Sequence, residues 1–288
     1  MSGGSYVEYK GRKGSSNVED RRGKGKGGIA LAGGGIGGLI LILIITFLGG
    51  SPSEVLNDLQ GADSGPSVPY EETAEEKELA EFVSVVLADT EVVWTKLFRE
   101  QGLEYEEPIL VLYTDSVQSA CGAAGASVGP FYCPGDHKLY IDLSFYQELQ
   151  DKFQAPGDFA MAYVVAHEVG HHVQTLLGIN EQVNALRPKL STEEFNKYSV
   201  RLELQADYFA GVWARHQKDM NYLEEGDLDE AITAASAVGD DRIQEQAQGY
   251  IVPDSFTHGT SEQRKRWFTK GFENGTIEGG DTFKASRL

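Results

Sequence analysis

The sequence predicts an α+β fold that is mostly helical and contains a small antiparallel or mixed sheet. Segments with apolar residues at helical spacing fill most of the chain after residue 70, whereas only three short apolar runs between residues 109 and 143 have the length of strands. The chain has 288 residues, enough for one substantial domain, residues 71–288, and an N-terminal appendage. Its 41% hydrophobic and 24% charged residues are typical of a globular protein.

The appendage has three parts. Residues 1–28 are rich in Gly and Ser and carry seven basic against three acidic residues, which predicts a disordered basic tail. Residues 29–48 are uncharged and mostly apolar, and such a helix is just long enough to cross about 30 Å of hydrocarbon, so they predict a single transmembrane helix. Residues 49–70 are rich in Gly, Ser, Pro and Asp, which predicts a flexible linker.

The charges beside the apolar run predict its orientation. Basic flanks remain on the cytoplasmic side of a membrane, so we expect a cytoplasmic N-terminus at the inner membrane and a periplasmic or extracellular domain. A cleaved signal peptide is the alternative, but its apolar core would be shorter, and residues 48–52 are a poor cleavage site. The glycines within residues 33–38 are not followed by Lys-Ser or Lys-Thr, which argues against a phosphate loop.

The formal net charge of the chain is −19, and because residues 1–28 contribute four net positive charges, the remainder carries about −23. So acidic a domain repels phosphates, which excludes nucleic acid as a partner. Strong acidity is otherwise a common solubility feature and identifies no substrate.

Several elements are predicted before the central motif. Residues 71–100 have the apolar spacing of a helix, and residues 109–113 form a fully apolar run typical of a buried strand. The runs 129–133 and 138–143 flank a Pro-Gly-Asp-His turn, which predicts a β-hairpin.

The chain contains two cysteines, Cys121 and Cys133, which bracket a short Gly- and Ala-rich loop. In an outward-facing domain this pair predicts a disulfide. Zinc ligation by the two thiols is the alternative.

The most informative segment lies on a helix predicted over residues 158–177. His167 and His171 are four residues apart, so they project from one face of this helix and suit the tetrahedral coordination of Zn²⁺. Glu168 follows the first histidine and can act as general base towards a water at the metal, the arrangement of the H-E-x-x-H motif. The alternative is a pair of buried histidines that bind other polar groups of the core.

A catalytic zinc site takes three protein ligands and keeps one position open. The third predicted ligand is Glu203, on a later helix that starts with a capping box of Ser191 and Glu194. Glu203 and Asp207 share a face of this helix, and adjacent carboxylates repel each other unless a cation lies between them. We therefore assign Glu203 to the metal and Asp207 to the ring N–H of a ligating histidine. A solvated acidic edge is the alternative.

Two further helices are predicted, over residues 228–248 and 261–270, the second with Thr260 and Gln263 in capping-box spacing. His258 precedes it in a loop, from which an imidazole can stabilise the oxyanion of a tetrahedral intermediate. A capping or structural role for His258 is the alternative. The remaining histidines are expected to be structural or solvated: His137, His172 and His216.

These motifs are similar to those of the bacterial membrane-anchored neutral zinc metallopeptidase family, which resembles the glutamate-type zincins with H-E-x-x-H on one helix and E-x-x-x-D on a later one. The resemblance spans roughly residues 70–275 and rests on residues 129–134, 139–142, 167–172, 203–211, 239–241 and 258–264. It implies a zincin-like fold, one Zn²⁺ per chain and hydrolysis of peptide bonds. It also implies that the predicted hairpin lies above the catalytic helix and pairs with extended substrate; an ordinary sheet is the alternative.

The combined prediction is a membrane-tethered, zinc-dependent endopeptidase that acts on a peptide or protein substrate, with Glu168 as general base. Two alternatives keep the metal: a zinc-stabilised binding or chaperone-like domain at the membrane surface, and a hydrolase of non-peptide amides. Zinc is inferred from the ligand types and from availability, because affinity alone would favour copper.

Overall fold

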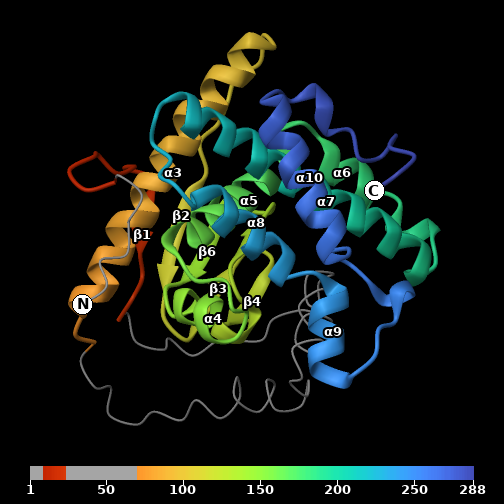
Figure 1. The fold of residues 1–288 in the computed structure, drawn as a ribbon, viewed down its shortest axis with the longest axis horizontal. Coiled ribbons are helices and arrows are strands. Elements are labelled where there is room, and N and C mark those ends of the chain that lie inside the picture. Colours follow the sequence, from red (N-terminus) through yellow and green to blue (C-terminus); the bar gives the residue numbers. More distant parts are fainter. Residues whose placement is uncertain (1–8, 24–69) are drawn as a thin grey trace.

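The computed structural model describes residues 9–23 and 70–288. Within these residues the fold is α+β, mostly helical with a small sheet, as predicted. Figure 1 shows the sheet beside the long helix α3 (Ala74–Glu100) and the central helix α5 (Asp158–Leu176). Helices α7 (Thr192–Asp219) and α10 (Ser261–Asn274) pack against each other, and α7 also packs on α5.

The main sheet has the strand order β1-β2-β6-β5. β2 runs parallel to both of its neighbours, and β5 runs antiparallel to β6. The predicted strand at 109–113 and the predicted hairpin are therefore confirmed. β5 is the last strand of the sheet, so its outer edge has no partner strand within the described residues. The four strands are β1 (Val18–Asp20), β2 (Ile109–Tyr113), β5 (Phe131–Cys133) and β6 (Lys138–Asp142).

A second hairpin, formed by β3 (Ser116–Ser119) and β4 (Gly122–Gly125), was not predicted, because Gly and Ala have low strand propensity. Cys121 lies in its turn and forms a disulfide with Cys133 at the end of β5. The predicted disulfide is confirmed, and zinc ligation by these thiols is thereby excluded. Closing so short a loop contributes about 3 kcal/mol to stability on the chain-entropy account.

The remaining helices are shorter: α4 (Phe145–Asp151), α6 (Ile179–Asn184), α8 (Asp227–Ala237) and α9 (Asp240–Gln248). Both predicted capping boxes are present, at the starts of α7 and α10. The prediction of one helix over residues 228–248 is wrong, because the chain is extended at Gly239 and separates α8 from α9. A Cβ at Gly239 would collide with the backbone of Ser261, so only glycine permits this close approach.

Helix α5 is the buried centre of the domain. It packs against α3, α7 and α8, and every residue from Asp158 to Gly170 is buried. The ring of Phe159 stacks on Trp213 of α7 with the centroids 5.5 Å apart. Polar groups on so buried a helix need partners, because an unpaired buried polar group is costly.

Gly170, inside the H-E-x-x-H motif, lies where α5 meets α7. A Cβ at this position would be 2.9 Å from the carbonyl oxygen of Ala206 and 3.1 Å from its Cα. Gly170→Ala is expected to lower the free energy of unfolding by about 1–2 kcal/mol, because overpacking costs roughly 1–3 kcal/mol and alanine recovers up to about 1 kcal/mol of helix propensity. Urea denaturation measures this loss. Gly125→Ala is the control, since its nearest atom would be 3.6 Å away, and equal losses would contradict the packing argument.

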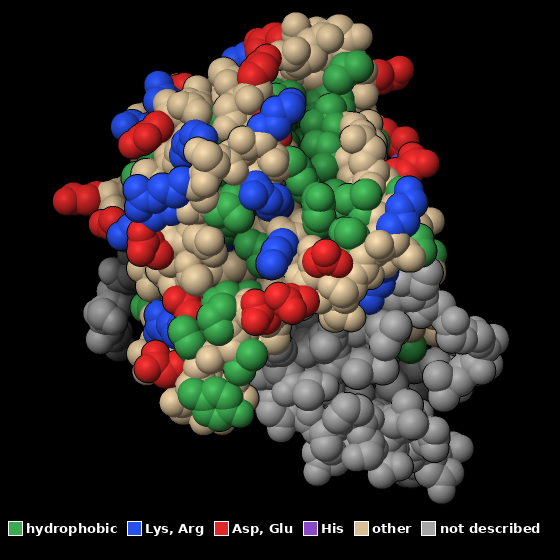
Figure 2. Space-filling view, turned by 90° about the vertical axis from the view of Figure 1, so that its right-hand side faces the viewer, with side chains coloured by type: hydrophobic (Ala, Val, Ile, Leu, Met, Phe, Trp, Pro, Cys, Tyr) green, Lys and Arg blue, Asp and Glu red, His purple; other side chains and the backbone are tan. Residues whose placement is uncertain are grey.

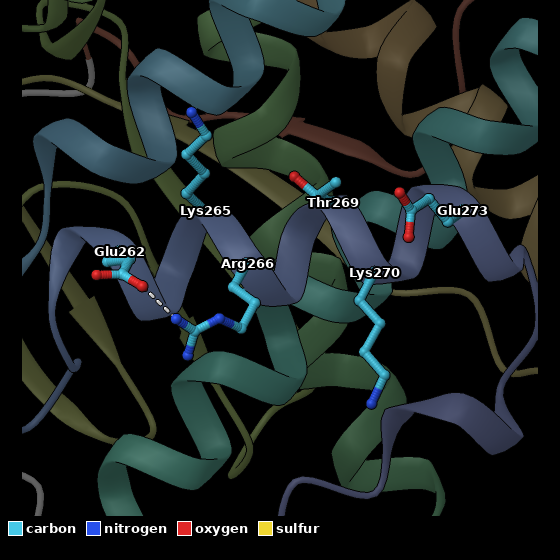
Figure 3. Close-up of a pocket in the computed structure, with 6 residues that line it drawn as sticks. All are labelled: Glu262, Lys265, Arg266, Thr269, Lys270 and Glu273. Atoms are coloured by element: carbon cyan, nitrogen blue, oxygen red, sulfur yellow. Dashed lines mark hydrogen bonds and ion pairs between the residues drawn. The ribbon is translucent and has the colours of Figure 1, made fainter. Parts of the chain in front are cut away.

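Helix α10 is amphipathic. Its buried inner face consists of Arg264, Trp267, Phe268 and Gly271. Its outer face, drawn in Figure 3, borders a shallow hollow and consists of Glu262, Lys265, Arg266, Thr269, Lys270 and Glu273. Charged side chains therefore cover the solvent side of this helix, while its one buried arginine faces the interior.

Charges of both signs are intermixed on the face of the molecule shown in Figure 2. Lys and Arg side chains there alternate with Asp and Glu, and apolar side chains lie between them. The acidic excess of the chain is therefore not gathered into one patch on the described part of this face.

Residues 9–23 correct the prediction of a disordered tail over residues 1–28. Tyr9 is only 2% exposed, and residues 18–20 form strand β1. The physical reason is that basic side chains of this segment pair with carboxylates of the domain, as Arg12 does with Asp89, instead of remaining solvated.

Among the helices of residues 9–23 and 70–288, none combines the length and the apolar character that a membrane crossing requires. The transmembrane helix predicted at residues 29–48, and the predicted linker up to residue 69, lie outside the described residues.

Candidate metal centre

Helices α5 and α7 bring the three predicted metal ligands together. His167, His171 and Glu203 each have a donor atom within 4.8 Å of the other two. Carboxylate oxygens of Glu203 are 3.2 Å from His167 Nε2 and 3.5 Å from His171 Nε2. Two ligands that bind one zinc ion at about 2.0–2.1 Å and at the tetrahedral angle lie roughly 3.3–3.4 Å apart. The spacing and chemistry of this donor set therefore fit Zn²⁺.

The other ring nitrogen of each histidine has its own partner. Nδ1 of His167 donates to Oδ1 of Asp207 at 2.9 Å, and Nδ1 of His171 donates to Oε1 of Gln174 at 2.9 Å. Gln174 is fixed in turn, because its side-chain nitrogen donates to the carbonyl of Leu202 at 2.7 Å. A proton on each Nδ1 leaves each Nε2 free to ligate a metal. Asp207 occupies its predicted place, whereas the role of Gln174, one helical turn after His171, was missed.

Asp207 is completely buried and lies in a polar cluster. Besides the ring of His167, it accepts hydrogen bonds from the hydroxyl of Tyr163 at 2.5 Å and from Nε and Nη2 of Arg264 at 2.8 and 3.0 Å. Arg264 is only 4% exposed, so this is a buried, two-point ion pair. No role was predicted for Arg264, because no local pattern relates it to Asp207; the two residues meet only because α10 packs on α7.

This cluster fixes the charges around the ligands. Burial opposes protonation of His167, but Asp207 and Glu203 outweigh it and raise its pKa to about 9. Burial would raise the pKa of Asp207, but Arg264 and the neighbouring imidazole lower it to about 2. The pKa of Glu203 is also well below its usual value, because histidines near it outweigh the effect of burial. Both carboxylates are therefore ionised at neutral pH, and a metal ion competes with protons for the histidines.

Glu168 is buried between the two histidines of its motif. Burial raises the pKa of its carboxyl group, although both imidazoles act against that rise. A carboxylate with a raised pKa is a stronger base, which suits proton transfer near neutral pH. The site remains open to solvent, because the side chains of His171 and Glu203 keep exposed fractions of 17% and 20%.

His258 is fixed in its loop by Asp240, the first residue of α9. Oδ2 of Asp240 accepts hydrogen bonds from the backbone N–H groups of Thr257, His258 and Gly259 at 2.8, 2.6 and 3.0 Å, and its Oδ1 lies 3.1 Å from His258 Nδ1. Burial lowers the pKa of His258, but Asp240 and Glu203 outweigh it and the net shift is upward. The loop thus brings His258 into the electrostatic environment of the ligand Glu203. This role of Asp240 was not predicted from the sequence.

His172 points away from the ligands and connects α5 to the edge strand. Its Nδ1 accepts from the hydroxyl of Tyr132 on β5 at 3.0 Å, and its Nε2 donates to the carbonyl of Glu106 at 2.6 Å. Burial lowers its pKa to about 4, so this imidazole is neutral at pH 7. The structural role predicted for it is confirmed. His216 similarly donates to the carbonyl of Gly275 at 3.1 Å, while His137 is partly exposed in its turn.

Comparison with known proteins identifies the family. The profile of the family described as "Putative neutral zinc metallopeptidase" matches residues 7–283. YpfJ of Escherichia coli (strain K12), whose name marks it as uncharacterized, is 47% identical over 291 residues, which cover 97% of this chain and 100% of the relative. Rv2575 of Mycobacterium tuberculosis (strain H37Rv), also named as uncharacterized, is 43% identical over 195 residues, which cover 64% of this chain and 65% of the relative. No solved structure matches the chain. The family match over most of its length shows that the chain belongs to the neutral zinc metallopeptidase family.

Proposed function

We propose that the protein is a zinc-dependent endopeptidase with a zincin-like active site. The observation that carries this proposal is the donor set of His167, His171 and Glu203, with Glu168 on the same helix as the two histidines. A site with three protein ligands leaves a position for water or substrate. The partial exposure of His171 and Glu203 supports access to that position.

Each residue around the site has a separate role in the proposed hydrolysis. Zn²⁺, when bound, polarises the scissile carbonyl and lowers the pKa of a water to about 7. Glu168 accepts the proton of the attacking water and then delivers it to the nitrogen of the leaving amine. His258, whose pKa is raised mainly by Asp240 against the effect of burial, donates a hydrogen bond to the oxyanion. Asp207 holds the ring of His167 in the tautomer that ligates through Nε2.

The edge strand β5 supplies a place for the substrate backbone. Tyr132 of β5 is hydrogen-bonded to His172 of α5, the residue that follows the ligand His171, so β5 packs on the part of α5 that carries the metal ligands. A peptide that extends along β5 would pair through its main chain, as in other strand-addition complexes. This feature favours a peptide over a non-peptide amide as the substrate.

The arrangement also weighs against a zinc site with a purely structural role. Structural zinc sites are closed by four protein ligands, whereas this centre brings together two histidines and one carboxylate in the described residues. A buried carboxylate such as Glu168, held next to the ligands with a raised pKa, serves no purpose in metal binding alone. Proton transfer during hydrolysis is a role that accounts for Glu168 at this position.

We further propose that the apolar run at residues 29–48 attaches the protein to a membrane. The disulfide between Cys121 and Cys133 supports a location in which disulfides persist, such as the periplasm or the cell exterior.

Metal removal tests the proposed activity. The zinc-loaded protein is expected to cut members of a peptide library, read by mass spectrometry. After chelation the rate should fall by at least about 100-fold, since carbonyl polarisation and water activation are lost together, and added Zn²⁺ should restore it. Circular dichroism checks that the chelated protein is still folded. The absence of cuts by folded, zinc-loaded protein would contradict the peptidase and favour the binding role.

A further inference from the structure

The segment that precedes the apolar run in the sequence is part of the folded domain. This N-terminal arm, residues 9–23, contributes strand β1, which pairs with β2 in the register Val18 to Leu110 and Asp20 to Leu112. Backbone hydrogen bonds extend the pairing on both sides, from Leu110 N to Asn17 O and from Arg21 N to Leu112 O, each at 2.8 Å. The arm is therefore an integral strand of the main sheet, as Figure 1 shows beside α3.

Side chains of the arm are buried against the domain as well. The ring of Tyr9 packs edge-on against Phe82 of α3 at 5.2 Å between centroids. The guanidinium of Arg12 lies 3.7 Å from the ring centroid of Tyr222, beyond the end of α7, and forms an ion pair with Asp89. Asp89 is only 8% exposed, and removing the partner of a buried charge is strongly destabilising. Detaching the arm would incur that cost in addition to the lost strand pairing.

The basic residues of the arm are mostly engaged by carboxylates. Lys10 pairs with Glu78 at 2.8 Å, and Arg22 pairs with Glu72 at 2.8 Å. The side chain of Arg22 keeps only 5% exposure. The membrane orientation predicted from the sequence assumed that the basic residues before residue 28 are solvated and lie beside the membrane. Their pairing with carboxylates of residues 70–288 weakens that reading.

A chain that crossed a membrane once between residues 23 and 70 would hold β1 and β2 on opposite sides of it. We propose instead that the arm and the domain of residues 70–288 lie on the same side of any membrane to which the protein is attached. This replaces the expected arrangement of a cytoplasmic N-terminus and an external domain. It does not depend on the proposed peptidase activity, because it rests on the packing of the arm alone.

An engineered disulfide tests the arrangement in intact cells. A Cβ at Gly14 would lie 3.1 Å from the Cβ of Ser84, close to the roughly 3.5–4.5 Å that disulfides span. The full-length protein with Gly14→Cys and Ser84→Cys, and a protease site inserted between residues 49 and 69, is treated in cells with a membrane-permeant oxidant. After denaturation and cleavage, the N-terminal fragment is expected to remain attached until a reductant is added. Each single cysteine variant serves as control and should release it without reductant.

The same variant in detergent completes the comparison. A crosslink that forms in detergent and not in cells would overturn the proposal, because the arm would reach the domain only when the membrane is dissolved. If the crosslink forms in neither, terminal epitope tags decide the question in sealed spheroplasts treated with protease. If the protease digests both the N-terminal and the C-terminal tag, or neither of them, the proposal is supported. Digestion of only one tag overturns it.

Discussion

Glu168→Gln is expected to lower kcat/KM for peptide cleavage by about 10²–10⁴-fold while zinc stays bound at one ion per chain. Glutamine keeps the size of the side chain but cannot accept the proton of the attacking water. The three proposed ligands, His167, His171 and Glu203, are unchanged by this substitution. Metal analysis and steady-state kinetics on the same purified sample measure the two quantities together.

A matched control for this prediction is Glu181→Gln on α6, where the side chain is exposed to solvent. It makes the same chemical change and should leave kcat/KM within a factor of about two, as expected for a surface site away from the chemistry. Full activity in purified Glu168→Gln protein would rule out the general-base role. Loss of zinc from that variant would instead show that Glu168 supports the metal.

Arg264→Gln is expected to lower the free energy of unfolding by about 3–5 kcal/mol, because it leaves the buried carboxylate of Asp207 without its counter-ion. The affinity for zinc should also fall, since Asp207 orients His167 through the hydrogen bond to Nδ1. Denaturant unfolding gives the stability, and competition with a chelating dye gives the affinity. Adding Asp207→Asn should recover part of the lost stability, because the unpaired charge is removed with its partner.

Arg266→Gln provides the comparison for this second prediction. Arg266 lies two residues further along α10 on the outer face shown in Figure 3, where it pairs with Glu262. An exposed pair of this kind contributes at most about 1 kcal/mol. If Arg264→Gln cost no more than Arg266→Gln, the assignment of Arg264 as the counter-ion of Asp207 would be wrong.

The parts of the site that follow local spacing were predictable from sequence. His167 and His171 share a face because they are four residues apart on one helix, and the same holds for Glu203 and Asp207. The strand at 109–113 was predictable because a short, fully apolar run bounded by turn-forming residues is typical of a buried strand. In each case the information lies within a few neighbouring residues.

The parts that depend on contacts between distant segments were not predictable. Arg264 reaches Asp207 only through the packing of α10 on α7, and the local sequence around either residue does not indicate this contact. Strand β1 has three residues, too few to show a period, and its stability comes from its pairing with β2. The break between α8 and α9 follows from the contact of Gly239 with Ser261, a partner distant in sequence.

Under the proposed peptidase function, the position of β5 at the end of the sheet has a consequence for which proteins are expected to be cut. A strand edge offers a row of main-chain groups that only an extended chain can match, so helices and closed sheets in a folded protein cannot dock there. Because the main chain is common to all sequences, such an edge selects a substrate by its backbone conformation more than by its residue types. Cleavage by this centre would then report on how unfolded a substrate is, and a single protein could be spared or degraded according to its folding state.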